Sequence, residues 1–188
     1  MLMKRQTTFD DLDHVEGLAE IVNGEIVMLP PKDFRHTRAS MYISDCLVEY
    51  EVRTQLGWTS ITGAHYRALL PHRMSFCPDV SFYQPSKIGK SEDGSLALAV
   101  EIRSAGDYGL VAERTMAAKR ADYFAAGTKV VWDVDIRKEG WIRSYRAEEP
   151  TSPLVFKQGD YAHAEPALTN WSMCVSGLMA EVQRVPLI

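Results

Sequence analysis

The sequence lacks the features that define several specialised classes of protein. Only three cysteines occur, Cys46, Cys77 and Cys174, and an odd number without a C-x-x-C pair argues against a disulfide framework or a zinc knuckle. No run approaches the roughly 18 apolar residues that a membrane helix needs, and Met1 to Asp13 lacks the apolar stretch of a signal peptide. We therefore expect a soluble, cytoplasmic protein with reduced thiols and no membrane partner.

Positive charge is not in excess either. The chain has 21 Lys plus Arg against 25 Asp plus Glu, a formal net charge of -4, which argues against a purely electrostatic nucleic-acid binder but leaves room for a local basic groove. With 12 Gly and 9 Pro the chain is not collagen-like, and 46% hydrophobic and 24% charged residues are typical of a globular protein. The 188 residues fit one domain, which we place at residues 1–188.

Hydrophobic periodicity divides the chain into strands and helices. Asn23-Gly24 tolerates the positive φ angles of a type I′ turn, so residues 18–29 are predicted as an N-terminal β-hairpin. An i, i+3, i+4, i+7 apolar spacing predicts a helix over residues 34–56, with Gly57 at its C-terminal end. Further strands are predicted at 58–70, 76–83, 96–103, 129–135 and 141–145, and further helices at 110–126 and 172–185.

The order of these elements indicates the fold class. A helix connects the strands predicted at residues 96–103 and 129–135, so we expect those two strands to be parallel and adjacent. The class is therefore α/β or α+β, with a mixed central β-sheet flanked by helices and preceded by the hairpin.

One carboxylate stands out within the strand at residues 96–103. The run Leu-Ala-Leu-Ala-Val-Glu-Ile is apolar except at Glu101, and a buried carboxylate is costly unless it is paired or bound to a cation. Strand alternation predicts that Ala97, Ala99 and Arg103 share the face of Glu101. A structural Glu101–Arg103 pair at the strand end explains this pattern as well as a functional site does.

A second carboxylate, Asp79, follows Pro78 at the start of the preceding strand. If the two strands are neighbours, Asp79 and Glu101 can converge on one point. Hard oxygen ligands in small number suit Mg²⁺, with Mn²⁺ as a substitute, and such an ion can activate water for attack on a phosphoryl group. Asp79 taken alone could equally be a loop cap.

This arrangement of strands and acids resembles the core of the PD-(D/E)XK nuclease superfamily, and within it the Uma-two family of restriction-endonuclease-like proteins. Further segments carry the resemblance from about residue 18 to residue 135. They are the run Glu20 to Glu25 with His36 beyond two prolines, Val100-Glu101-Ile102 followed by Ser104, Lys119 with Tyr123 and Gly127, and Val131 to Asp135.

The resemblance implies a restriction-endonuclease-like fold and an Mg²⁺-dependent endonuclease that cleaves DNA, with Asp79, Glu101 and the carbonyl of Ile102 as metal ligands. It implies Lys119 as the catalytic lysine, because Arg103 stands where the superfamily consensus has lysine. The loop Ser104-Ala105-Gly106 also departs from the family's Ser-Pro-Ser. A homodimer, with two sites facing a duplex, follows by the same analogy.

Two further residues are weaker candidates. Glu25 matches an acid of the family and could bind the metal directly or through water, and an exposed polar residue in a strand is an equal alternative. His36 could contact a phosphate or orient water, as Arg103 could contact a phosphate, although a surface or capping histidine is commoner. A nuclease-fold module without catalysis, acting as a nucleic-acid or protein binding scaffold, is the competing hypothesis.

Overall fold

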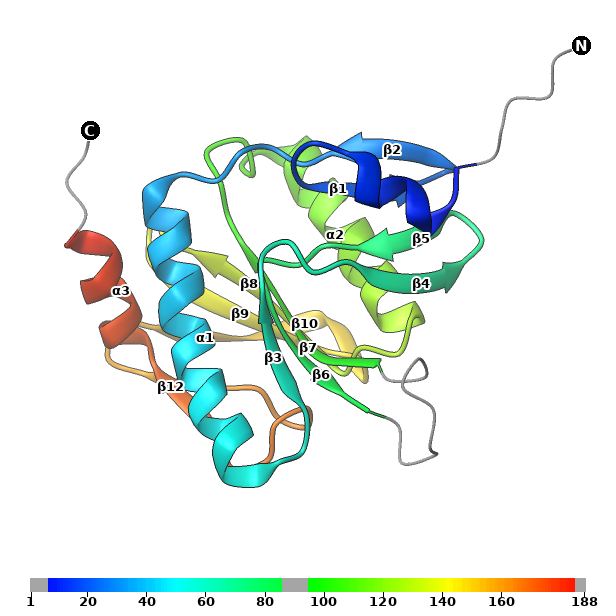
Figure 1. Cartoon of the computed structure of the whole chain (residues 1–188). Coiled ribbons are helices and arrows are strands. Elements are labelled where there is room, and N and C mark those ends of the chain that lie inside the picture. The colour runs from blue at the N-terminus through cyan, green and yellow to red at the C-terminus, as the bar shows by residue number, and fades with distance from the viewer. Residues whose placement is uncertain (1–6, 86–94, 185–188) are drawn as a thin grey trace, which may run out of the picture.

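The computed structural model describes residues 7–85 and 95–184 and is built around a mixed six-stranded sheet (Figure 1). Its strand order is β10-β9-β8-β7-β6-β3. β7 and β8 are parallel, as predicted, and the other neighbouring pairs are antiparallel. The strands are β3 (Trp58–Ile61), β6 (Val80–Gln84), β7 (Ser95–Ile102), β8 (Val130–Asp135), β9 (Trp141–Arg146) and β10 (Glu149–Lys157).

A second, four-stranded sheet has the order β2-β1-β5-β4. The predicted hairpin is confirmed as β1 (Ala19–Val22) and β2 (Glu25–Met28), joined by Asn23 and Gly24 at φ angles of 53° and 73°. β5 (Arg73–Phe76) pairs with β1 and with β4 (Tyr66–Leu70). β2 is an edge strand, and its apolar residues Ile26, Val27 and Met28 are exposed.

The helices cover the two faces of the six-stranded sheet. α1 (Phe34–Thr54) and α3 (Val175–Gln183) pack together on one face, over a core that contains Val80, Phe82, Leu98 and Trp132. α2 (Leu110–Ala125) lies on the other face, next to the four-stranded sheet (Figure 1). The remaining elements are the 3-10 helix η1 (Phe9–His14) and the strand pair β11 (Tyr161–His163) and β12 (Ser172–Cys174). None of the described helices is long and apolar enough to cross a membrane.

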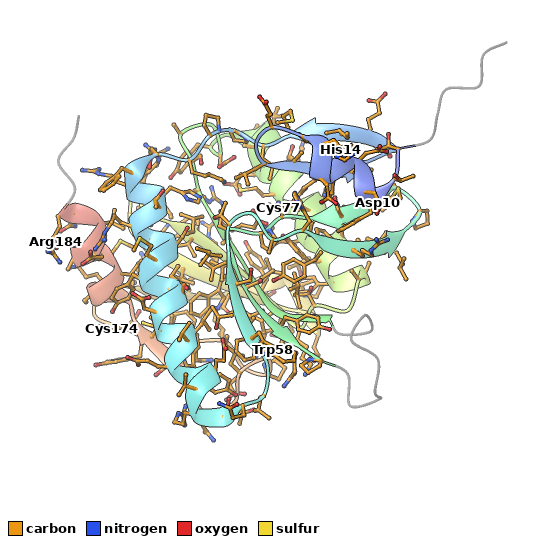
Figure 2. The ribbon with its side chains drawn as sticks, viewed as in Figure 1. Asp10, His14, Trp58, Cys77, Cys174 and Arg184 are labelled. Carbon is orange, nitrogen blue, oxygen red and sulfur yellow. The ribbon has the colours of Figure 1, made fainter. Side chains whose placement is uncertain are left out.

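The core around Tyr123 joins both sheets to α2. The Tyr123 ring, fully buried, stacks on Phe76 of β5 with ring centroids 4.1 Å apart and also packs against Ala99 of β7. This contact fixes the rotation of α2 about its axis, so that residues one turn before Tyr123 face the same side. The cysteines are free thiols, and Figure 2 shows Cys77 and Cys174 in separate parts of the molecule.

Several strand boundaries differ from the predictions. The sequence predicts one strand over residues 58–70, but this run is divided between β3 and β4, which belong to different sheets. It also predicts one strand over residues 76–83, but this run begins at the end of β5 and continues as β6 beyond Cys77-Pro78. α1 ends at Thr54 and is capped by Gln55, which has φ 55°, and not by Gly57. Gly57 serves a different purpose, because a Cβ there would lie 2.1 Å from the Tyr83 carbonyl oxygen.

The predicted alternation in β7 is wrong at one residue. The register against β6 shifts between Phe82 and Tyr83, which pair with Leu98 and Leu96, so Ala97 is the extra residue of a bulge. As a result Leu96 packs in the core on the side of Ala99 and Tyr123, whereas Ala97 belongs to the core beneath α1. Ala99, Glu101 and Arg103 keep the predicted alternation, since the shift lies before them.

Candidate active site

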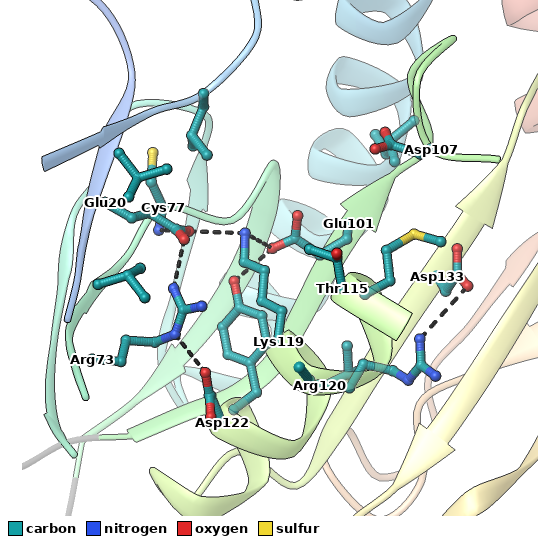
Figure 3. A pocket seen from close by; sticks show the side chains of 18 of the residues that line it. Glu20, Arg73, Cys77, Glu101, Asp107, Thr115, Lys119, Arg120, Asp122 and Asp133 are labelled. Atoms are coloured by element: carbon teal, nitrogen blue, oxygen red, sulfur yellow. Dashed lines mark hydrogen bonds and ion pairs between the residues drawn. The ribbon is translucent and has the colours of Figure 1, made fainter. Parts of the chain in front are cut away.

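Lys119 of α2 stands between two carboxylates that come from different sheets. Its Nζ lies 2.9 Å from Glu101 Oε1 on β7 and 2.8 Å from Glu20 Oε1 on β1 (Figure 3). The Tyr123 hydroxyl donates to the same Glu101 oxygen at 2.6 Å. Tyr123 follows Lys119 by one helical turn, so both side chains reach the end of β7 from one face of α2. The second carboxylate oxygen of Glu101 receives neither of these two bonds.

Glu20 belongs to a chain of alternating charges that runs outward from Lys119 (Figure 3). Arg73 NH1 donates to Glu20 Oε2 at 2.6 Å, and Arg73 Nε donates to Asp122 at 2.7 Å. Asp122 in turn contacts the exposed His72 at 2.7 Å. The backbone N–H of Cys77 also donates to Glu20, so three donors hold this buried carboxylate in place. Glu20 therefore orients Lys119 while its own hydrogen-bonding capacity is largely used.

Asp79 lies just before β6, on the side of α1. Its Oδ2 accepts the backbone N–H of Ile102 at 2.7 Å and lies 3.0 Å from His36 Nε2. Its Oδ1 lies 3.0 Å from Lys32 Nζ. Because the N–H and C=O of one strand residue point to the same edge, the Ile102 carbonyl also faces the Asp79 side. Asp79 and His36 are both about 2% exposed, so the histidine holds the carboxylate and does not reach the surface.

The carboxylates influence one another electrostatically. Burial raises the pKa of Glu101, and the charges of Asp79 and Glu20 raise it further against the opposing effect of Lys119. Burial would also raise the pKa of Asp79, but His36, Lys32 and the Ile102 N–H together hold it below its ordinary value. For Lys119, burial favours the neutral amine, yet Glu101 and Glu20 keep its pKa above the ordinary range. Lys119 is therefore a protonated ammonium at neutral pH.

A pocket of about 510 Å³ opens beside these groups, between α2 and the ends of β7 and β8. Glu20, Lys32, Glu101, Lys119 and Asp133 are among its lining residues. Such a volume is within the usual range for ligand sites, and the charged groups that converge on its apolar wall make it the candidate functional cleft. Asp79 is not among the lining residues, but its ion-pair partner Lys32 is.

The donor set fits a small hard cation. Asp79, Glu101 and the Ile102 carbonyl supply oxygen ligands from the ends of adjacent strands, and the mutual repulsion of Glu101, Asp79 and Glu20 is what a cation would relieve. Within residues 7–85 and 95–184 there is no group of three or more His, Cys, Asp or Glu side chains suited to a metal. Mg²⁺ commonly takes only one or two carboxylates and keeps several waters, so two are sufficient.

Arg103 is buried and pairs with Asp133 and Glu113. Its Nε and NH2 donate to the two oxygens of Asp133 at 2.7 Å each, and NH1 and NH2 donate to Glu113 at 2.5 and 3.1 Å. NH1 also donates to the Asp107 carbonyl. The loop from Ser104 to Gly106 folds into a turn closed by Asp107, whose carboxylate accepts the Ser104 N–H. All five N–H donors of the guanidinium are thereby occupied.

The structure brings Asp79, Glu101, Lys119 and His36 into one region, but places Glu25 elsewhere. Glu25 lies exposed on β2 opposite Val22, outside the pocket. Glu20, five residues earlier, reaches Lys119 instead. The sequence contained a signal for this, because Glu20 interrupts an apolar strand in the same way that Glu101 does.

Comparisons with known proteins give a matching family and a solved structure with the same fold. A family model described as "Uma2: Putative restriction endonuclease" matches residues 7–177. No curated protein matches the chain. Among solved structures, a protein from Anabaena variabilis described as a "putative nuclease belonging to DUF820" superposes with a TM-score of 0.72. The two chains are 15% identical, and the alignment covers 94% of this chain and 99% of the other, which establishes a shared fold.

Proposed function

Because the chain belongs to the Uma2 family, described as putative restriction endonucleases, we propose that it is a divalent-metal-dependent endonuclease that hydrolyses phosphodiester bonds in DNA. One observation carries the proposal. Lys119 Nζ lies within 2.9 Å of the buried Glu20 and the half-buried Glu101 at the rim of a pocket, and Glu101 lies near the end of β7, beside the start of β6 that Asp79 precedes. A lysine beside acids that can hold a divalent ion supports phosphodiester hydrolysis, because the ion activates water and the ammonium stabilises developing negative charge.

Asp79, Glu101 and the Ile102 carbonyl would hold the ion, with Mg²⁺ or Mn²⁺ as the species that suits their oxygens. When bound, such an ion supplies activation of water and offsets negative charge on the phosphoryl group. His36 and the Ile102 N–H orient Asp79, and Tyr123 orients Glu101. Lys119, held between Glu20 and Glu101, has the charge and position to steer the attacking water and to stabilise the transition state.

The test is nicking of supercoiled plasmid DNA with Mg²⁺, Mn²⁺ or EDTA. We expect nicking with either ion and none with EDTA. Glu101→Gln and Lys119→Met should each reduce the rate by about a hundredfold or more, the usual cost of removing one group that stabilises the transition state. The matched controls are Glu139→Gln and Lys157→Met, which alter an exposed Lys–Glu pair and should nick at the wild-type rate. Full activity in EDTA, or in Lys119→Met, would refute the assignment.

A scaffold without catalysis is the second candidate, and one observation favours it. Lys32 and Lys119 already pair with Asp79 and Glu101, so protein cations alone keep these acids neutralised. Titration with Mn²⁺ in a calorimeter separates the two candidates, because a scaffold has no reason to bind the ion. We also propose a homodimer, by analogy with enzymes that cut both strands of a duplex, and light scattering on the purified protein tests it.

A further inference from the structure

Lys32 borders both Asp79 and the pocket, as the backbone of Ile102 does. It lies in the loop between β2 and α1, and its Nζ is 3.0 Å from Asp79 Oδ1. Its side chain is 17% exposed and lines the pocket together with Glu101 and Lys119. A single change of its rotamers would therefore carry the ammonium from the buried acid into the pocket.

The backbone around Lys32 is held on both sides. Pro30 and Pro31 precede it, and proline fixes φ. Asp33 follows it and caps α1 by accepting the His36 N–H at 2.8 Å. Movement is thus confined to the flexible four-carbon side chain of Lys32, which is the kind of side chain that can exchange one anion for another.

The two oxygens of Asp79 are not equally available to an ion. Oδ2 is held by the Ile102 N–H, a main-chain group at the end of β7, and by the buried His36 ring. Releasing the Ile102 N–H would require β7 to move, and burial restricts the rotation of the His36 ring. Within residues 7–85 and 95–184, the polar contact of Oδ1 is with Lys32. A divalent ion therefore reaches Asp79 through Oδ1, which the Lys32 ammonium now occupies, and the two cations cannot share this position.

We propose that Lys32 is a second substrate-facing cation of this site, held on Asp79 in the metal-free protein and displaced into the pocket, against a substrate phosphate, when a divalent ion takes its place. The inference rests on the proposed function, because it assumes that Asp79 ligates the ion. The displaced Lys32 ammonium would bind a phosphate oxygen of the nucleic acid. The proposal also accounts for the ion pair between Lys32 and Asp79, a residue that the reaction needs as a metal ligand.

The first experiment measures Mn²⁺ binding by calorimetry in the full chain. Lys32→Met removes the competing ammonium and should bind Mn²⁺ about tenfold more tightly than wild type, a difference of about 1.4 kcal/mol. Lys32→Arg keeps a competing cation and should bind like wild type, as should the exposed control Lys157→Met. Thermal unfolding tests the same exchange of the Lys32 ammonium for a divalent ion. Without metal the melting temperature of Lys32→Met should be lower than that of wild type, and at saturating Mg²⁺ the two melting temperatures should be equal. Unchanged or weaker Mn²⁺ binding in Lys32→Met would overturn the competition.

The second experiment measures binding of a fluorescent mixed-sequence duplex in Ca²⁺, an ion of similar ligand preference. In Ca²⁺, Lys32→Met should bind the duplex several-fold more weakly than wild type, because the Lys32 ammonium of wild type is displaced and reaches a phosphate. Without metal the two proteins should bind the duplex equally, because the Lys32 ammonium of wild type then stays on Asp79. Equal affinity in Ca²⁺ would overturn the phosphate contact. If wild type and Lys32→Met both bind no Mn²⁺, the metal-dependent function itself fails. If wild type binds Mn²⁺ and Lys32→Met does not differ, only this inference fails.

Discussion

Replacement of Arg103 separates a structural role from a substrate contact. In the folded protein its five N–H donors meet Asp133, Glu113 and the Asp107 carbonyl, and its side chain is about 2% exposed. Arg103→Met would leave Asp133, itself about 3% exposed, without its main partner. Removing one member of a buried ion pair costs about 3–5 kcal/mol. Each kcal/mol lowers the melting temperature of a domain of this size by about 2–4 °C, so we expect a fall of roughly 6–20 °C.

The assay is thermal unfolding followed by circular dichroism, with DNA affinity measured well below the transition. Arg103→Lys should lose part of the same stability, because an ammonium has three donors and cannot make the bidentate contact to Asp133. Adding Asp133→Leu to Arg103→Met should recover most of the loss, since the unpaired buried charge is gone. Arg67→Met, which alters an exposed arginine, is the control. A melting temperature within 2 °C of wild type together with weaker DNA binding would refute this reasoning and make Arg103 a substrate contact.

Three further outcomes follow from the contacts. His36→Gln should weaken Mn²⁺ binding measured by calorimetry, because Asp79 is then held less firmly and the competing Lys32 ammonium is still present. This effect is opposite to the one expected for Lys32→Met. The contacts that lower the pKa of Asp79 stabilise the folded protein at pH values above the ordinary carboxyl pKa, and this stabilisation is lost as the pH falls through the lowered pKa. The free energy of unfolding of Asp79→Asn should therefore change less with pH in the acid range than that of wild type. Burial with the charges of Glu49 and Asp45 raises the pKa of Cys46 to about 11, so mass spectrometry should find this thiol almost unreacted with iodoacetamide at pH 8.

The parts of the fold that could be predicted are those in which a local pattern decides the structure. The Asn23-Gly24 turn, the parallel pair β7 and β8 and the start of α2 all follow from turn chemistry, crossover topology and helical spacing. The division of 58–70 into β3 and β4 could not be predicted this way, because both halves have strand composition and only tertiary pairing assigns them to different sheets. The bulge at Ala97 is likewise invisible in the alternation of alanine and leucine.

The same limit applies to the candidate site. Glu101 was recognisable because a carboxylate in an apolar strand needs a partner, and Lys119 was expected near it. The role of Glu20 could not be predicted, since β1 joins the site only through the packing of one sheet against another. The salt bridge between Arg103 and Asp133 could not be predicted from the sequence, because the register of β7 against β8 is what brings the two residues together.

The division of the site between two sheets and α2 also has a consequence for synthesis on the ribosome. Glu20, Asp79 and Glu101 all emerge before Lys119, and Glu20 meets Lys119 only after α2 has docked between the sheets. Contacts between such distant segments form late, because closing long loops must precede them. A nascent or truncated chain that ends before α2 carries the acids without the lysine. With the proposed activity, such an unfinished chain lacks the lysine to which the cleavage of DNA is assigned.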